Sequence, residues 1–336
     1  MTAPDSPQDP LSAPAPNAAQ VPTALQVPNA APAPNAAQTP DPWRLLEGAQ
    51  RVLTLQAHPD DETLSTGALL AYLAACGTRI DLVTATRGEE GETVPGSIAP
   101  DDARSFVEVR AAELDSATRS LGITSSCFLG SPPALAPGAD ARRYRDSGMR
   151  WVTPQLAGPA EDTGPDAFTR RPVAEAVADL EAAIRALRPD VLLSNDDGGT
   201  YGHPDHVHVH TIAARAAAAQ GVPLIEVASY HDADAQADDP SFAQRELPGT
   251  ARAVEGALRA HRTQLTILGQ AAAEGAGSGV AGVDAAEGAG SDVDRAGRGS
   301  SGAASGIRIV LSGGQERVVP LSAGIRVHRE EPVDAR

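Results

Sequence analysis

The sequence contains no lysine, because all 27 of its basic residues are arginines, and 44 acidic residues give the 336-residue chain a formal net charge of −17. Nucleic-acid binders neutralise phosphates with a basic surface, so this charge excludes a general nucleic-acid binder. It does not exclude a small-molecule substrate. Cysteine is also scarce, and Cys76 and Cys127 alone do not suggest a disulfide framework.

Long apolar runs are missing as well. The longest uncharged stretch of the apolar part, residues 63–78, is shorter than the roughly 20 residues that a membrane span needs. No apolar segment precedes the first basic residue, Arg44, so no secretory signal is expected. These absences predict a cytoplasmic protein without membrane insertion. They leave its assembly into a homo-oligomer open.

Two segments have compositions that cannot form a core. Residues 1–40 hold 10 prolines and 11 alanines, and residues 271–306 hold 10 glycines and 11 alanines. Such stretches bury too little apolar surface to offset the entropy lost on folding. The expected organisation is therefore a disordered leader (1–41), one main domain (42–270), a flexible Gly/Ala-rich insertion (271–306) and C-terminal strands that complete the domain (307–336).

Strands and helices are expected to alternate along the main domain. Apolar runs predict strands at 51–57, 80–86, 191–194 and 224–228. Apolar stripes at helical spacing predict helices from residue 62 to about 75 and at 103–121, 173–187, 207–219 and 251–268. Short antiparallel strands are expected at 307–311, 317–321 and 325–328. This alternation predicts an α/β fold with a mostly parallel sheet covered by helices on both faces.

Two His-Pro-Asp clusters stand directly before helices. His58-Pro59-Asp60-Asp61-Glu62 follows the first strand, and His203-Pro204-Asp205-His206 follows a glycine-rich loop. A proline in the first helical turn fixes φ where no amide donor is needed. Because ligands of open parallel sheets bind at the carboxyl ends of the strands, the two clusters can face each other although His203 lies 145 positions after His58.

These residue types suit a catalytic zinc with three nitrogen and oxygen ligands and water in the open position. We assign His58, Asp61 and His206 as ligands. Asp60 is then the base that deprotonates the water, His203 a second imidazole near the oxyanion or leaving amine, and Asp205 a group that orients a histidine. Ferrous iron would suit the same ligands. The alternative is that all of these residues are helix caps and core residues.

Other histidines carry weaker signals. His206 and His210 are four apart, as in zinc-binding helices, but Asp61 already completes a trio of ligands. His210 is therefore not assigned as a ligand. His328 is a single histidine without a partner pattern, and so is His261 when the residues are taken alone.

The two clusters resemble the signatures of the N-acetylglucosaminyl-phosphatidylinositol de-N-acetylase family, also called PIG-L or LmbE-like. The resemblance rests on 57–62 and 203–206 and runs from about residue 51 to residue 264. It is closer still to the mycothiol-pathway branch, which deacetylates N-acetylglucosaminyl-inositol, through 88–92, 144–149, 199–203 and 261–264. The resemblance implies a Rossmann-like sheet and a zinc-dependent deacetylase.

The resemblance also implies roles for residues farther from the metal. Tyr201 is similar to the family tyrosine that helps to polarise the acetyl carbonyl, and Arg110, Asp146 and Glu92 are similar to sugar and aglycone contacts. With Arg87 they form a mixed set of acids and arginines, which suits a neutral polyol such as inositol better than a dicarboxylate. The departures from the family pattern are the leader, the insertion and a threonine before Tyr201.

The expected function is hydrolysis of the 2-acetamido group of an N-acetylglucosamine conjugate, with N-acetylglucosaminyl-inositol as the substrate and acetate as a product. One alternative keeps this chemistry with N-acetylglucosaminyl-malate or another acetylated glycan or antibiotic. A more distant alternative is a non-catalytic metal-containing carbohydrate-binding protein, although such a protein would not need Asp60.

Overall fold

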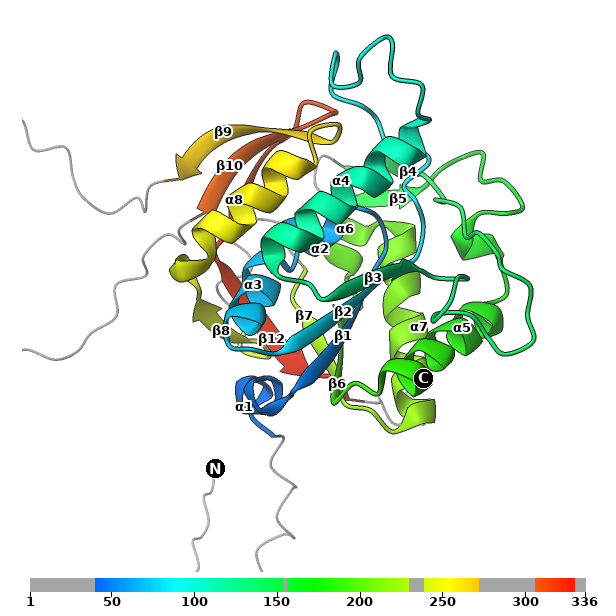
Figure 1. The fold of residues 1–336 in the computed structure, drawn as a ribbon, viewed down its shortest axis with the longest axis vertical. Helices are drawn as coiled ribbons and strands as arrows, with labels where there is room; N and C mark the ends of the chain where they lie inside the picture. Colours follow the sequence, from blue (N-terminus) through cyan, green and yellow to red (C-terminus); the bar gives the residue numbers. More distant parts are fainter. Residues whose placement is uncertain (1–39, 154–155, 230–238, 272–305, 330–336) are drawn as a thin grey trace, which may run out of the picture. The chain divides into compact units, whose positions relative to one another are not determined.

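The computed structural model describes residues 40–153, 156–229, 239–271 and 306–329. Nearly all of the expected leader and of the expected insertion lies outside these residues. Within them, seven strands form the main sheet (Figure 1), in the order β3 (Ser125–Phe128), β2 (Arg79–Thr84), β1 (Arg51–Gln56), β6 (Val191–Asn195), β7 (Leu224–Val227), β12 (Ser322–Val327) and β8 (Ala243–Glu246).

The sheet is mostly parallel, as predicted. The five strands from β3 to β7 pair in parallel, and β12 runs antiparallel to both β7 and β8. Parallel neighbours align their carboxyl ends at one edge of the sheet. That edge therefore receives the segments that follow β1, β2 and β6, which contain the residues singled out in the sequence.

Helices cover both faces of the sheet, because alternate side chains of each strand point to opposite sides. Val52 of β1 belongs to the core under α1 (Pro42–Gly48), α3 (Gly67–Ala75), α4 (Phe106–Leu121) and α8 (Ala251–Ala260). The next residue, Leu53, belongs to the core under α5 (Val173–Leu187) and α7 (Pro204–Gln220). Figure 1 shows these two groups of helices on either side of the strands.

Local sequence explains where the main helices begin and end. Ser105 and Glu108 form a capping box at the start of α4, and Gly122 ends that helix in the left-handed conformation. In α7, Pro204 occupies the first turn, and Nδ1 of His203 accepts the amide hydrogen of Asp205 at 3.2 Å. The second His-Pro-Asp cluster is thus part of a regular helix start.

Three predictions about elements need correction. The helix expected up to about Ala75 is two helices, α2 (Asp61–Leu64) and α3, separated at Ser65 and Thr66. The helix expected over 251–268 ends at Ala260, and β9 (Leu265–Ala271) follows, because the same apolar residues also satisfy a strand. Strands β3 and β8 were not predicted, since their short sequences carry no clear alternation.

Smaller elements surround the carboxyl edge of the sheet. β9, β10 (Gly306–Leu311) and β11 (Glu316–Pro320) form an antiparallel three-stranded sheet, and β4 (Met149–Trp151) pairs with β5 (Ala157–Pro159). Both cysteines are free, as expected. No helix among the described residues is long and apolar enough to cross a membrane.

Candidate metal centre and active site

The structure brings three predicted ligands together, and we call His58, Asp61 and His206 the inner cluster. His58 lies two residues after the end of β1, Asp61 begins α2, and His206 lies in the first turn of α7. Nδ1 of His58, Nε2 of His206 and Oδ2 of Asp61 are each 3.2 Å from the other two. All three side chains are buried.

This triangle fits a metal ion. Zinc binds imidazole nitrogens and carboxylate oxygens at roughly 2.0–2.2 Å, which separates neighbouring ligands of a tetrahedral site by roughly 3.3–3.4 Å. The observed separations of 3.2 Å agree with one face of such a tetrahedron. Two imidazoles and one carboxylate are also a donor set that a divalent zinc or iron ion accepts.

Outer partners orient each imidazole of the inner cluster. Nε2 of His58 lies 3.2 Å from Oδ2 of Asp205, so the buried aspartate can hold the ring with Nδ1 directed at the ligand position. His206 is oriented by a hydrogen bond of 2.9 Å between its Nδ1 and Oγ1 of Thr200. The threonine that departs from the family pattern therefore supports a candidate ligand.

Charge is concentrated in the inner cluster. Burial opposes ionisation of Asp61, but the His206 and His58 imidazoles hold the pKa of its carboxyl well below the ordinary value. For His58, burial lowers the pKa, yet the carboxylates of Asp146, Asp205 and Asp61 together raise it well above the ordinary value. Metal binding to this set therefore requires a proton to leave.

The predicted base, Asp60, has an unusual backbone. Its φ of 127° lies in a region that favours glycine, and such a conformation persists only where surrounding contacts impose it. Nη2 of Arg110 donates to the Asp60 carboxylate at 3.1 Å and to the carbonyl of Pro59. The Asp60 amide donates to Oε2 of Glu62 at 2.9 Å, so both ends of the residue are held.

Burial also shapes the chemistry of Asp60. It raises the pKa of the carboxyl to about 6, although the Arg110 guanidinium opposes the rise. A carboxylate with such a pKa can both accept a proton and return it near neutral pH. Behind it, Nε2 of His261 lies 2.7 Å from Oε1 of Glu62, and both side chains are buried. His261, which belongs to no histidine motif in the sequence, thus has a defined partner.

Tyr201 and His203 flank the inner cluster. The ring of Tyr201 lies 5.5 Å from that of His206 and 5.9 Å from that of His203, between centroids. Burial and the nearby Asp61 carboxylate raise the pKa of the Tyr201 phenol above its ordinary value, so it stays protonated. Burial, His58 and His206 lower the pKa of His203 well below its ordinary value, so its ring is neutral.

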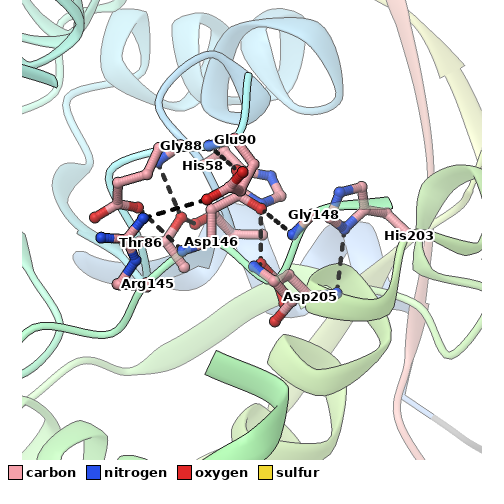
Figure 2. Close-up of polar contacts among 12 residues, drawn as sticks. His58, Thr86, Gly88, Glu90, Arg145, Asp146, Gly148, His203 and Asp205 are labelled. Carbon is pink, nitrogen blue, oxygen red and sulfur yellow. Dashed lines mark hydrogen bonds and ion pairs between the residues drawn. The ribbon is translucent and has the colours of Figure 1, made fainter. Parts of the chain in front are cut away.

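Asp146 lies beside His58 (Figure 2). Its Oδ1 is 3.6 Å from Nε2 of His58, and the same oxygen accepts the Gly148 amide at 2.8 Å. Burial raises the pKa of Asp146, but His58 and His203 lower it by more, so the net value lies below the ordinary one. Figure 2 also shows the ion pair of 3.2 Å between Arg145 and Glu90 beside this aspartate.

A cavity of about 430 Å³ opens over these groups. Eight of the eleven predicted site residues line it, namely His58, Asp60, Asp61, Glu92, Arg110, Asp146, Tyr201 and His203. His206 and Asp205 lie fully buried behind its wall. Arg87 is not among the lining residues, because its guanidinium stacks on the Phe128 ring at 4.3 Å.

Other parts of the cavity wall were not predicted. Trp151 of β4 lines it and stacks against Tyr201 with 5.5 Å between ring centroids. The β10–β11 hairpin contributes further residues, including Gln315 and Arg317. Their sequence carries no motif, and only the pairing of β9 with β10 brings the hairpin to the site. Trp151, an aromatic residue in a polar segment, was the one sequence feature that could have indicated this part of the cavity wall.

Comparison with known proteins identifies the family. The sequence profile of the family described as PIG-L, GlcNAc-PI de-N-acetylase, matches residues 53–217. A protein from Salinispora arenicola named 1D-myo-inositol 2-acetamido-2-deoxy-alpha-D-glucopyranoside deacetylase is 37% identical over 251 residues, which cover 64% of this chain and 76% of that protein. The chain therefore belongs to the GlcNAc-PI de-N-acetylase family, as the sequence motifs predicted.

A protein of the same name from Kineococcus radiotolerans is 40% identical over 171 residues, or 51% of this chain and 45% of that protein. The match thus spans about half the length of this relative. Among solved structures, the chain is similar to N,N'-diacetylchitobiose deacetylase from Pyrococcus horikoshii, with 19% identity, a TM-score of 0.45, and coverage of 66% of this chain and 73% of that one.

Proposed function

We propose that the protein is a metal-dependent N-deacetylase that hydrolyses the 2-acetamido group of an N-acetylglucosamine conjugate. The main support is the inner cluster, in which His58, Asp61 and His206 place three donor atoms 3.2 Å apart beside the Asp60 carboxylate. Metal ligands and a base in one cavity are what amide hydrolysis by water requires. A carbohydrate-binding protein would have no use for the base.

The inner cluster would hold zinc or ferrous iron. When bound, such an ion supplies a Lewis acid that polarises the acetyl carbonyl and acidifies water. Asp205 and Thr200 keep the two imidazoles directed at the ion, as partners of metal-binding histidines generally do. Because both ions accept these donors, metal analysis of the purified protein is needed to identify the native ion.

Asp60 would move the proton. It takes a proton from the attacking water as the new C–O bond forms, and that proton goes to the amine nitrogen as the C–N bond breaks. The products are acetic acid and the amino sugar, and the acid ionises to acetate as the amine takes up its proton. Its pKa of about 6 suits both halves of this transfer, and Arg110 fixes the carboxylate in place.

Tyr201 and His203 would stabilise the developing negative charge on the acetyl oxygen. The phenol stays protonated and can donate a hydrogen bond. Nδ1 of His203 accepts the Asp205 amide hydrogen, so the proton of the neutral ring resides on Nε2, which can donate in the same way. Neither residue needs to change its charge for this task.

The proposed substrate is the inositol conjugate of N-acetylglucosamine. The relatives described above are named as deacetylases of this compound. The cavity carries acids and two arginines on its wall, including Glu92, Asp146 and Arg317, and such a mixed set suits the hydroxyls of a neutral polyol.

A primary-amine release assay tests this function. The purified chain is given N-acetylglucosaminyl-inositol, N-acetylglucosaminyl-malate, N,N'-diacetylchitobiose and free N-acetylglucosamine, each with and without a chelator. We expect chelator-sensitive release that is fastest with the inositol conjugate. Faster turnover of the malate conjugate would overturn the substrate, and no release from any compound would overturn the activity.

A further inference from the structure

A second group of two histidines and one carboxylate lies outside the cavity, and we call His210, Glu226 and His328 the outer cluster. His210 is on α7, one helical turn beyond His206, while Glu226 is on β7 and His328 follows the end of β12. These residues do not line the cavity. Three elements that are distant in sequence therefore bring their side chains to one point.

The donor atoms of the outer cluster converge. Nε2 of His210 and Nδ1 of His328 each lie 2.6 Å from the same oxygen, Oε1 of Glu226. All three atoms lie within 4.8 Å of one another, so a small ion can reach each with minor side-chain rotation. The side chains of His210 and His328 are 13% and 21% exposed, which leaves a path for an ion and its remaining waters.

The second oxygen of Glu226 is already fixed. Oε2 accepts a hydrogen bond from Nε of Arg326, whose Nη2 pairs with Asp197 at 3.0 Å. Carboxylates that bind metals are usually hydrogen-bonded in this way on the oxygen that does not bind. Arg326 pairs with both Glu226 and Asp197, so these three groups together carry one formal negative charge, which favours a cation.

The geometry points to a second divalent-cation site formed by His210, Glu226 and His328, for an ion of the zinc type that accepts two nitrogens and one oxygen. An ion there would join α7, β7 and the end of β12. Its role would be structural, because the site is separate from the cavity and from Asp60. This inference does not rest on the proposed function.

Zinc stoichiometry tests the second site. The tag-free chain is stripped with a chelator, dialysed against buffers of stepped free zinc and analysed by plasma emission. We expect wild-type protein to bind a second equivalent at higher free zinc, and His328→Gln and His210→Gln each to lose it. His208→Gln is the matched control, since His208 is on the same helix but packs edge-on against Phe168, and it should keep both equivalents.

The variants also separate this site from the inner cluster. His206→Ala should lose the tighter equivalent and keep the weaker one, whereas His328→Gln should do the reverse and retain full deacetylase turnover. Zinc should raise the melting temperature of His206→Ala but not that of the double variant His206→Ala/His328→Gln. The inference is overturned if His328→Gln and His210→Gln, folded by circular dichroism, bind as much zinc as wild type at every concentration, or if folded His206→Ala binds no zinc.

Discussion

The inner and outer clusters use the same residue types in different surroundings. Each has two imidazoles and one carboxylate, and α7 supplies one histidine to each, at positions 206 and 210. Among the described residues, the buried Asp61 carboxylate of the inner cluster forms its ion pairs with imidazoles and not with a guanidinium. In the outer cluster the Glu226 carboxylate is buried too, but it forms an ion pair with the Arg326 guanidinium, and the two imidazoles are partly exposed.

This difference indicates what each cluster is suited to do. A buried carboxylate without a permanent cation favours a bound dication, which can then act on a substrate in a water-poor cavity. A carboxylate that has its own arginine is stable without metal, so an ion adds to a structure that is already formed. Residue type does not separate the two clusters, and neither does burial of the carboxylate, since both carboxylates are buried. The partner of the carboxylate and the exposure of the imidazoles do separate them.

The largest difference between the clusters is expected when each loses its α7 histidine. His206→Ala should abolish tight metal binding and lower turnover by about 10⁴-fold or more, because the Lewis acid is lost with its ligand. His210→Ala removes the same side chain one turn away and should leave turnover within about twofold of wild type. Equal losses of turnover in both variants, measured by amine release, would contradict the assignment.

The next prediction distinguishes loss of the base from loss of the metal. Asp60→Ala takes away the proton acceptor but none of the three ligands, so we expect kcat to fall by roughly 10²-fold or more with metal content unchanged. Asp60→Asn is the matched variant, since it keeps the shape and the Arg110 contact without the basicity. Near-normal turnover in either variant would assign the base to another group.

A smaller effect is expected when the inner cluster keeps its ligands but loses an orienting partner. Asp205→Ala removes the carboxylate 3.2 Å from Nε2 of His58 and should weaken metal binding by about 10–100-fold, measured by competition with a chelator. Asp205→Asn keeps a hydrogen-bond acceptor and should lose less. An unchanged affinity in Asp205→Ala would mean that Asp146 alone orients His58.

The last effect concerns the stability of the outer cluster, not turnover, and it is present at neutral pH and lost in acid. Burial raises the pKa of Glu226, but His210, Arg326 and His328 lower it to a net value of about 2. Ionised Glu226 therefore stabilises the fold at every pH above its ordinary pKa of 4.5. This stabilisation is lost as the pH falls toward about 2.

Glu226→Gln should lack this part of the acid dependence, which amounts to about 3 kcal/mol at most. Urea unfolding of both proteins, followed from neutral pH downward without metal, measures the difference. The gap in unfolding free energy should narrow below pH 4.5. A gap that stays constant with pH would show that Glu226 contributes by packing rather than by charge.

Those parts of the site that are set by residues adjacent in the sequence were predictable. A His-Pro-Asp cluster directly after a strand or before a helix fixes its own position, so the motifs alone place His58, Asp61 and His206 together. The parallel sheet was predictable for the same reason, since alternating strands and helices leave few arrangements.

Contacts between distant segments were not predictable where no motif marked either segment. The partners of His328 become visible only when β12 pairs with β7, and nothing in the local sequence announces that pairing. Arg110 was expected at the sugar, yet its hydrogen bonds go to Asp60, Pro59 and Gly88, as the close approach of the Gly88 backbone allows. Long side chains reach several places, and spacing does not choose among them.

The φ of 127° at Asp60 has a consequence for protein engineering. An aspartate held there costs roughly 1–3 kcal/mol, whereas glycine adopts the same conformation without strain. Asp60→Gly would relieve this strain, but it would also leave the buried Arg110 guanidinium without its carboxylate partner, which costs about 3–5 kcal/mol. Selection for heat resistance on this chain is therefore expected to retain the base, because the ion pair that holds the strained backbone is worth more than the strain.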